Sequence, residues 1–290
     1  MSTLFLIGNG FDLNCGLKTR YTDMYNGYIL SESKSVIIKS FKESISGDHQ
    51  LWSDFELAIA DYARNLNNEL EIIECISDFS VYMREYLLNE QALFFETIKK
   101  NDTISLILNE MKLSLQSYYT GITHNLDSEL GQRNPGSLEN IKFATFNYTK
   151  VIDKVVELYT RNTKYARDKV LHIHGKVEED PVLGLDNIEQ FRIPYNLTEK
   201  GKRHLIKPVF NEIYDKNRVD ELYSMIHNSD VIVAYGLSLG ETDITWRNEI
   251  IQWLLKATFH HFIFYDYTLS SKEYRTINDR LDLEEDAKNE

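Results

Sequence analysis

Five short apolar runs, set far apart along the chain, limit the folds that this sequence can adopt. Each run is almost continuously apolar, as strands are when both faces of their sheet are covered. Helical patterns over 149–161, 217–228 and 242–257 accompany the later runs. The runs are TLFLI (3–7), IKFATF (141–146), VLHIH (170–174), DVIVAYG (230–236) and HHFIFYD (260–266). This alternation predicts an α/β fold with a doubly wound, Rossmann-like parallel sheet flanked by helices.

More than 120 residues separate the first run from the second. This interval contains no proline between 21 and 126 and reads as successive amphipathic helices. We therefore expect a large helical insertion or cap over 35–130, placed on an α/β core formed by 1–34 and 131–275. The acidic stretch 276–290 is expected to be a frayed tail.

Charge and cysteine usage exclude several classes of protein. A net charge of −13 argues against bulk attraction to nucleic acid or to an anionic membrane. The two cysteines, Cys15 and Cys75, form no C-x-x-C pair, which excludes a cysteine zinc ribbon and a disulfide framework. The first apolar run is too short for a signal peptide, and no segment approaches the roughly 18 apolar residues of a membrane helix. We expect a cytoplasmic protein that does not use a membrane.

Small and hydrogen-bonding residues follow four of the five runs. Parallel strands bring their carboxyl ends to one edge of a sheet, where ligands of open α/β folds bind. The four segments are Gly8-Asn9-Gly10-Phe11-Asp12, Asn147-Tyr148-Thr149, His172-Ile173-His174-Gly175 and the stretch from Gly236 through Ser238 and Gly240 to Asp243. We expect these segments to enclose one binding or active-site cleft.

The first of these segments turns from a strand through Gly8 and Gly10 into a helix. Backbone N–H groups at such a turn can bind a phosphate. However, the third glycine of the usual dinucleotide fingerprint is missing, because Leu13 stands in its place. A tight turn with Asn9 or Asp12 capping the helix is the alternative reading.

The ordered set GNGFD, WSDFE (52–56), FNYT, HIHG, LGLD (183–186) and GLSLGETD resembles the AbiH family of bacterial abortive-infection proteins, over residues 5 to about 250. The resemblance implies a sirtuin-like NAD-binding fold, a distant branch of that group. It assigns Gly8, Asn9 and Gly10 to the pyrophosphate of NAD, and Asn147 to the nicotinamide ribose or the attacking water. His174 would be the general base, and Gly236 and Ser238 would line the adenosine half. Asp12 and Thr149 would complete the cofactor site, Asp12 as a helix cap or a ribose contact.

Two positions depart from the pattern. Sirtuins carry an acid where this chain has Thr149, and a hydroxyl cannot supply negative charge. AbiH relatives often have histidine where this chain has Leu237.

The resemblance implies an anti-phage effector that cleaves the nicotinamide–ribose bond of NAD, with no metal. A phage-derived trigger and control through the helical insertion are expected, and assembly into a homo-oligomer stays open. The main alternative is a non-catalytic sensor that binds NAD or an ADP-ribose derivative and controls assembly or a partner. An enzyme acting on another nucleotide or on nucleic acid is a further alternative, which the net charge disfavours.

The motifs allow three other interpretations. The G-x-S-x-G segment around Ser238 is also typical of esterases, with His260 or His261 as the base. His172 and His174, expected on one face of a strand, could hold zinc with Asp186. Trp52 and Phe55 predict a buried helical face, whereas Asp54 and Glu56 predict a helix cap and a salt bridge.

Overall fold

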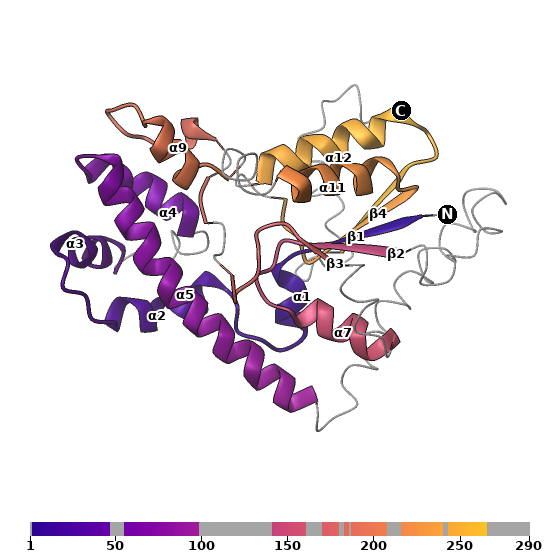
Figure 1. Ribbon diagram of the computed structural model, residues 1–290, viewed down its shortest axis with the longest axis horizontal. Helices are drawn as coiled ribbons and strands as arrows, with labels where there is room; N and C mark the ends of the chain where they lie inside the picture. Colours follow the sequence, from indigo (N-terminus) through magenta and orange to yellow (C-terminus); the bar gives the residue numbers. More distant parts are fainter. Residues whose placement is uncertain are drawn as a thin grey trace, which may run out of the picture.

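The computed structural model describes residues 2–46, 55–98, 141–160, 170–179, 183–185, 187–207, 216–239 and 243–265. A parallel five-stranded sheet in the order β3-β2-β1-β4-β5 forms one part of the molecule (Figure 1). Its strands are β1 (Thr3–Ile7), β2 (Ile141–Thr145), β3 (Val170–His172), β4 (Val231–Tyr235) and β5 (His261–Tyr265). All five apolar runs are therefore strands, and the predicted α/β fold with a parallel sheet is confirmed.

Helices cover both faces of the sheet. Alternate residues of each strand point to opposite faces, so each face packs against its own set of helices. Phe5 and Ile7 of β1 face α1 (Asn9–Asn14) and α7 (Val151–Thr160). Leu4 and Leu6 face α11 (Lys216–His227) and α12 (Ile244–Lys256). The chain places β2 and β3 on one side of β1 and then crosses to β4 on the other. The order of strands thus reverses at β1, beside β4.

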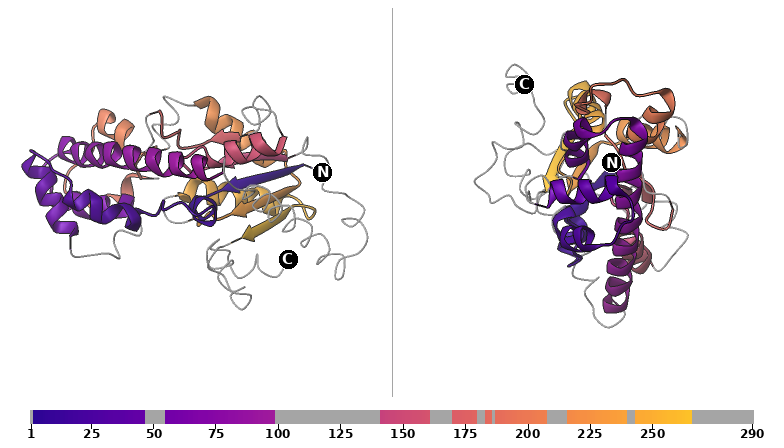
Figure 2. Two further views of the ribbon diagram at one scale, coloured as in Figure 1. Left: turned by 90° about the horizontal axis from the view of Figure 1, so that it is seen from below. Right: turned by 90° about the vertical axis from the view of Figure 1, so that its left-hand side faces the viewer.

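A second part of the molecule is helical and lies beyond the carboxyl ends of the strands (Figures 1 and 2). Its aromatic-rich core includes Phe41, Phe55 and Phe79, with the rings of Phe55 and Phe79 stacked at 3.7 Å between centroids. The elements are α2 (Tyr21–Leu30), α3 (Val36–Ile45), α4 (Phe55–Tyr62), η2 (Ala63–Asn65), α5 (Glu69–Ile98), η4 (Ile188–Gln190) and α9 (Glu199–Leu205). Although the sequence assigned 1–34 to the sheet core, Tyr25 and Tyr28 of α2 pack in this helical core.

The 30-residue helix α5 links the two parts. Ile72, Phe79 and Leu87 belong to the helical core, whereas Phe94 and Ile98 pack under the sheet with α7. Figure 2 shows this helix running along the long direction of the molecule. Residues 99–130 of the predicted insertion and the tail 276–290 lie outside the described residues.

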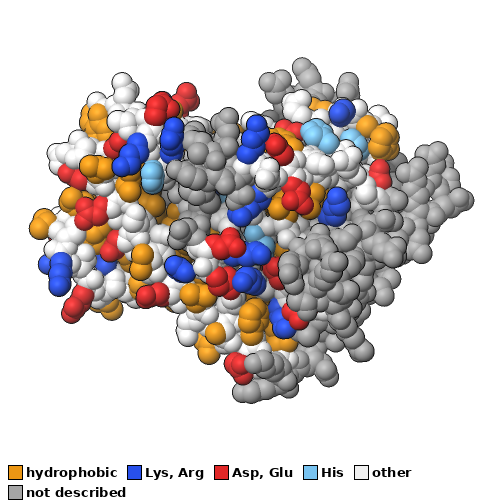
Figure 3. Space-filling model, viewed as in Figure 1, with side chains coloured by type: hydrophobic (Ala, Val, Ile, Leu, Met, Phe, Trp, Pro, Cys, Tyr) orange, Lys and Arg blue, Asp and Glu red, His pale blue; other side chains and the backbone are white. Residues whose placement is uncertain are grey.

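None of the described helices is both long enough and apolar enough to cross a membrane. On the face shown in Figure 3, basic and acidic side chains of the described residues are interspersed.

Candidate functional site

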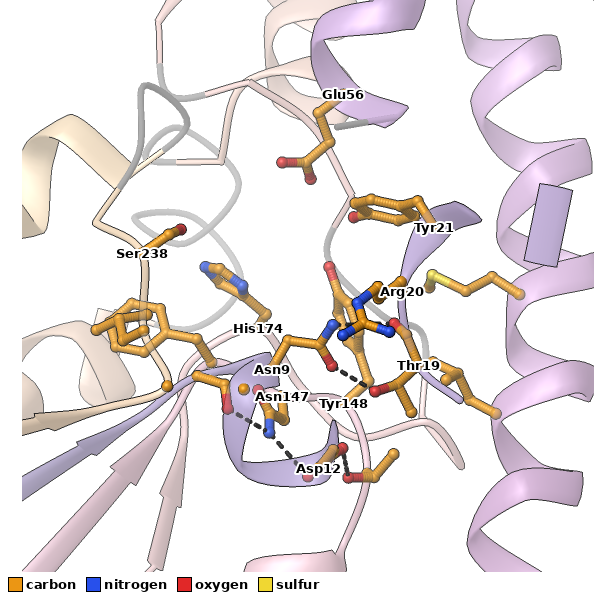
Figure 4. Close-up of a pocket in the computed structure, with 18 of the residues that line it drawn as sticks. Asn9, Asp12, Thr19, Arg20, Tyr21, Glu56, Asn147, Tyr148, His174 and Ser238 are labelled. Carbon is orange, nitrogen blue, oxygen red and sulfur yellow. Dashed lines mark hydrogen bonds between the residues drawn. The ribbon is translucent and has the colours of Figure 1, made fainter. Parts of the chain in front are cut away.

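A pocket of about 490 Å³ opens at the carboxyl ends of the strands, between the sheet and the helical part. Its size suits a small-molecule ligand. One wall comes from the segments that follow β1, β2, β3 and β4, and the other from α2, α4 and α5 (Figure 4). All residues that the sequence placed in the site line it: Gly8, Asn9, Gly10, Asp12, Asn147, Thr149, His174, Gly236 and Ser238.

The first glycine turn packs backbone to backbone against the turn after β4. A Cβ on Gly8 would lie 2.4 Å from the carbonyl oxygen of Gly236, and a Cβ on Gly10 would lie 2.6 Å from its Cα. Gly236 itself has φ of +62°, a left-handed conformation that favours glycine. The three glycines are therefore required for this close approach, whether or not a nucleotide binds.

In this packing, the backbone N–H groups of Gly8 and Gly10, which the sequence analysis assigned to a phosphate, are hydrogen-bonded within the protein. The N–H of Gly8 donates to the carbonyl of Tyr235 at 3.0 Å, and the N–H of Gly10 donates to the carbonyl of Gly236 at 2.8 Å. An anion at this turn would have to be bound by other donors, such as the N–H of Asn9 or a nearby cation. The assignment of Gly8 and Gly10 to a pyrophosphate remains a prediction. In it, the two glycines line the wall beside the pyrophosphate but do not donate their N–H groups to it.

Neither Asn9 nor Asp12 caps α1, so that expectation was wrong. Instead, the side chain of Asn9 donates to the carbonyl of Thr19 at 3.1 Å and accepts from the Thr19 hydroxyl at 2.5 Å. This pair holds the connection between α1 and α2 at the rim of the pocket. Arg20 follows directly, and its exposed guanidinium extends toward Asn9 in Figure 4. Within the described ranges, no carboxylate forms an ion pair with Arg20.

Asp12 forms a buried cluster with Asn147 and Thr149 at the floor of the pocket. Its Oδ1 accepts from the side-chain amide of Asn147 at 2.9 Å, and its Oδ2 accepts from the hydroxyl of Thr149 at 2.5 Å. The same amide of Asn147 also donates to the carbonyl of Gly8 at 3.0 Å. Burial raises the pKa of Asp12 from 3.8 to about 7, although both hydrogen bonds lower it. The carboxyl therefore titrates near neutral pH.

His174 lies in the pocket wall beyond the end of β3. Its ring meets the ring of Phe146 edge to face, with 5.4 Å between centroids. Burial, followed by the positive charge of Lys207, holds the pKa of His174 well below 6.5, while a hydrogen bond to the backbone of Phe146 acts in the opposite direction. The imidazole is therefore neutral at pH 7 and can accept a proton.

Hydrogen bonds from the segment after β2 and from α5 fix the segment that carries His174. The N–H of Val177 donates to the carbonyl of Tyr148 at 2.8 Å, next to Asn147. From α5, Arg84 donates to the carbonyls of Val177 and Glu178 at 3.1 and 3.0 Å. The segments after β2 and β3 are thus held together as one wall.

The expectation that His172 and His174 share one face of a strand was wrong, because β3 ends at His172 and His174 lies beyond it. The Nε2 of His172 lies 2.7 Å from a carboxylate oxygen of Asp153 on α7, which indicates a structural role. Asp186, the third residue of the zinc reading, lies outside the described residues. Within the described part of the chain, no three His, Cys, Asp or Glu side chains gather as a metal site.

Glu56 forms the salt bridge that the sequence predicted. Its carboxylate lies 2.6 Å from the ammonium of Lys207 and also accepts from the N–H of Gly184 at 3.1 Å. Both charged side chains are buried and line the pocket. Trp52 and Asp54 lie outside the described residues.

The esterase reading with His260 or His261 is wrong. His261 pairs with Val231 at the amino end of the sheet, whereas Ser238 follows the carboxyl end of β4. The Nδ1 of His260 is bonded to the carbonyl of Trp253 at 2.5 Å. Neither imidazole can therefore act on the Ser238 hydroxyl.

Sequence reasoning missed several residues of the pocket. Arg20 lies directly before α2 and Tyr21 begins that helix, Lys207 follows α9, and Met83 and Leu87 lie on α5. None follows a strand, so the rule that located the other residues does not apply to them. An arginine directly before a helix and close to a glycine turn is the one signal that could have indicated Arg20.

The family model described as bacteriophage abortive infection AbiH matches residues 4–265. No curated protein and no solved structure matches the chain significantly. The matched range contains the described sheet except for Thr3, together with every residue that lines the pocket.

Proposed function

Because the chain belongs to the AbiH family of bacteriophage abortive-infection proteins, we propose that it is an anti-phage effector that hydrolyses the nicotinamide–ribose bond of NAD. The observation that carries this proposal is the pocket in which Asn147 and His174 lie with the glycine turns of β1 and β4. Dinucleotide-binding sheets have the strand order 3-2-1-4-5-6 and bind outside the carboxyl ends, where the order reverses. The order β3-β2-β1-β4-β5 and the position of the pocket agree with that arrangement and support a sirtuin-like fold.

NAD would enter as a substrate that spans the pocket. The adenosine half would lie along Gly236 and Ser238, and the nicotinamide ribose beside Asn147 and His174. The amides of Gly8 and Gly10 are already bonded, so the pyrophosphate needs another source of positive charge. The guanidinium of Arg20, at the rim of the pocket beside Asn9, is suited to it, since arginine binds phosphate oxygens in a bidentate manner.

In this reaction the protein must orient the ribose and accept one proton. The C1′–N bond breaks with its electron pair moving to the nicotinamide nitrogen, which loses its positive charge. Water forms the new C1′–O bond and releases a proton to neutral His174. Asn147 accepts a hydrogen bond from a ribose hydroxyl or from that water. The products are nicotinamide, ADP-ribose and one proton.

The test measures nicotinamide and ADP-ribose by chromatography after NAD is added to the purified protein, with and without extract from phage-infected cells. A phage-derived trigger is part of the proposal, because an unregulated NAD hydrolase would kill its host. We expect His174→Ala and Asn147→Ala to abolish release, whereas His204→Ala on exposed α9 leaves it unchanged. Full release by both pocket variants, each folded by circular dichroism, would reject the assignment.

A sensor that binds NAD or an ADP-ribose derivative without cleaving it is the second candidate. The observation that favours it is Thr149, because its hydroxyl is engaged by Asp12 and position 149 supplies no negative charge. Calorimetry would select this candidate if NAD binds to the wild-type protein in infected extract while no nicotinamide is released.

A further inference from the structure

Asn147 can present either its amide nitrogen or its amide oxygen to a ligand, and its neighbours decide which. The two groups that face one end of this amide are the Gly8 carbonyl, at 3.0 Å, and the Asp12 carboxylate, at 2.9 Å. When Asp12 is ionised, both are acceptors, so the nitrogen must face them, because an oxygen there would meet two acceptors and no donor. The amide oxygen is then the atom that remains for a ligand.

Asp12 is held rigidly enough to impose this orientation. It lies in the first turn of α1, whose start is fixed by the glycine packing against Gly236, and its side chain is almost fully buried. Each carboxylate oxygen accepts one hydrogen bond, from Asn147 and from Thr149.

When it is ionised, Asp12 carries a buried charge that the fold does not need. No Lys or Arg pairs with it within the described residues, and its only side-chain partners are neutral donors. A buried carboxylate without a counterion destabilises a fold, so a residue of this kind is typical of a functional site.

We propose that Asp12 is the positioning residue of this site: together with the Gly8 carbonyl it turns Asn147 so that the amide oxygen accepts from a hydroxyl of the ligand. Its ionised carboxylate, which accepts from the Thr149 hydroxyl, also supplies the negative charge that position 149 itself lacks. The inference rests on the proposed function for its reaction, but the orientation of Asn147 is independent of it. The ligand must therefore offer a hydrogen-bond donor, a ribose hydroxyl or a bound water, to Asn147.

An exchange of the two side chains tests this role. Asp12→Thr removes the carboxylate, and Thr149→Asp introduces a second one beside the first. The double variant Asp12→Thr/Thr149→Asp restores one acid and one hydroxyl with their positions reversed. We expect each single variant to lower kcat for nicotinamide release by about 10- to 100-fold, as the loss of a supporting partner does, with a smaller effect on KM. The double variant should recover at least about tenfold over both, because Asn147 regains an oriented acceptor.

Asp220→Asn, on the exposed side of α11, is the matched control and should keep wild-type kcat. A purely structural role predicts that activity follows thermal stability. At pH 8, where Asp12 is ionised, our proposal predicts the opposite for Asp12→Asn: a variant that is at least as stable as the wild type but less active, because position 12 no longer carries negative charge. Wild-type kcat in folded Asp12→Asn, or no recovery in a folded double variant, would overturn the proposal.

The side-chain NH₂ signal of Asn147, identified by its loss in Asn147→Ala, gives a readout that needs no turnover. In the wild type at pH 8 we expect a downfield, exchange-protected pair of protons, and in Asp12→Thr a loss of that protection by at least about tenfold. If the wild type releases no nicotinamide but this signal behaves as expected, the hydrolase assignment fails while the positioning role stands. An unprotected signal in the wild type contradicts the positioning role itself.

Discussion

The ammonium of Lys207 and the carboxylate of Glu56 lie 2.6 Å apart and join the helical part of the chain to the wall of the pocket. Glu56 comes from the first turn of α4, and Lys207 follows α9, so the pair connects segments 151 residues apart. The positive charge of Lys207 also lowers the pKa of His174. Stability and the chemistry of the site are therefore linked through this pair.

Removal of one partner of this ion pair should destabilise the fold strongly. We expect Glu56→Gln to lower the free energy of unfolding by about 3 to 5 kcal/mol, because it leaves a buried ammonium without its counterion. Glu56→Gln/Lys207→Met should recover part of this loss. Urea unfolding measures both, with Glu199→Gln at the exposed Glu199–Lys202 pair as the control, for which little change is expected.

Alanine at the packed glycines should be far more damaging than alanine at an open one. A Cβ on Gly236 would lie 2.5 Å from the nitrogen of Phe11, and the residue has positive φ. We expect Gly236→Ala to cost more than about 3 kcal/mol, since overpacking adds to backbone strain. Gly16 also has positive φ, at +88°, but a Cβ there meets nothing within 4 Å. Gly16→Ala should therefore cost only about 1 kcal/mol, and equal thermal shifts in the two variants would contradict the packing argument.

The raised pKa of Asp12 makes its contribution to stability depend on pH. The folded protein holds this proton up to about pH 7, whereas the unfolded chain releases it near 3.8. The contribution is complete below pH 3.8 and is lost as the pH rises through 7. Relative to the wild type, Asp12→Asn should gain up to about 4 kcal/mol between pH 4 and pH 8. Urea unfolding at both pH values checks this, and a gain of the same size in exposed Asp220→Asn would refute it.

The lowered pKa of His174 predicts a neutral imidazole through the physiological range. Its folded pKa lies below the ordinary value of 6.5, so the associated stability is present above that pH and is lost as the pH falls through the folded value. In proton NMR spectra, the ring signals of His174 should show no titration between pH 8 and pH 6.5. Lys207→Met should move the midpoint upward, because a nearby positive charge is removed. An unchanged midpoint in that variant would exclude Lys207 as a cause.

The strands and the place of the pocket could be predicted because both depend on local signals. Near-continuous apolar runs identify strands that are covered on both faces, and the helix at 149–161 was predicted within two residues of Val151–Thr160. Strand ends such as Asn147 and Gly236 then fall at one edge by the geometry of a parallel sheet.

The contacts within the site could not be predicted, because they join distant segments. The bond between Asp12 and Thr149 spans 137 residues, and nothing in either local sequence specifies the other. For the same reason, the sequence suggested that the amides of Gly8 and Gly10 were open to a phosphate, when the turn after β4 occupies them. Met83 and Lys207, in the helical wall of the pocket, do not follow a strand, so no local sequence pattern marked them as pocket residues.

One continuous helix, α5, contributes to the helical core and to the core on one face of the sheet, and it places Met83 and Leu87 at the pocket between them. The two parts of the molecule are consequently connected by an uninterrupted helix. A rotation of the helical part would therefore displace Met83 and Leu87 at the pocket together with Phe94 and Ile98 beneath the sheet.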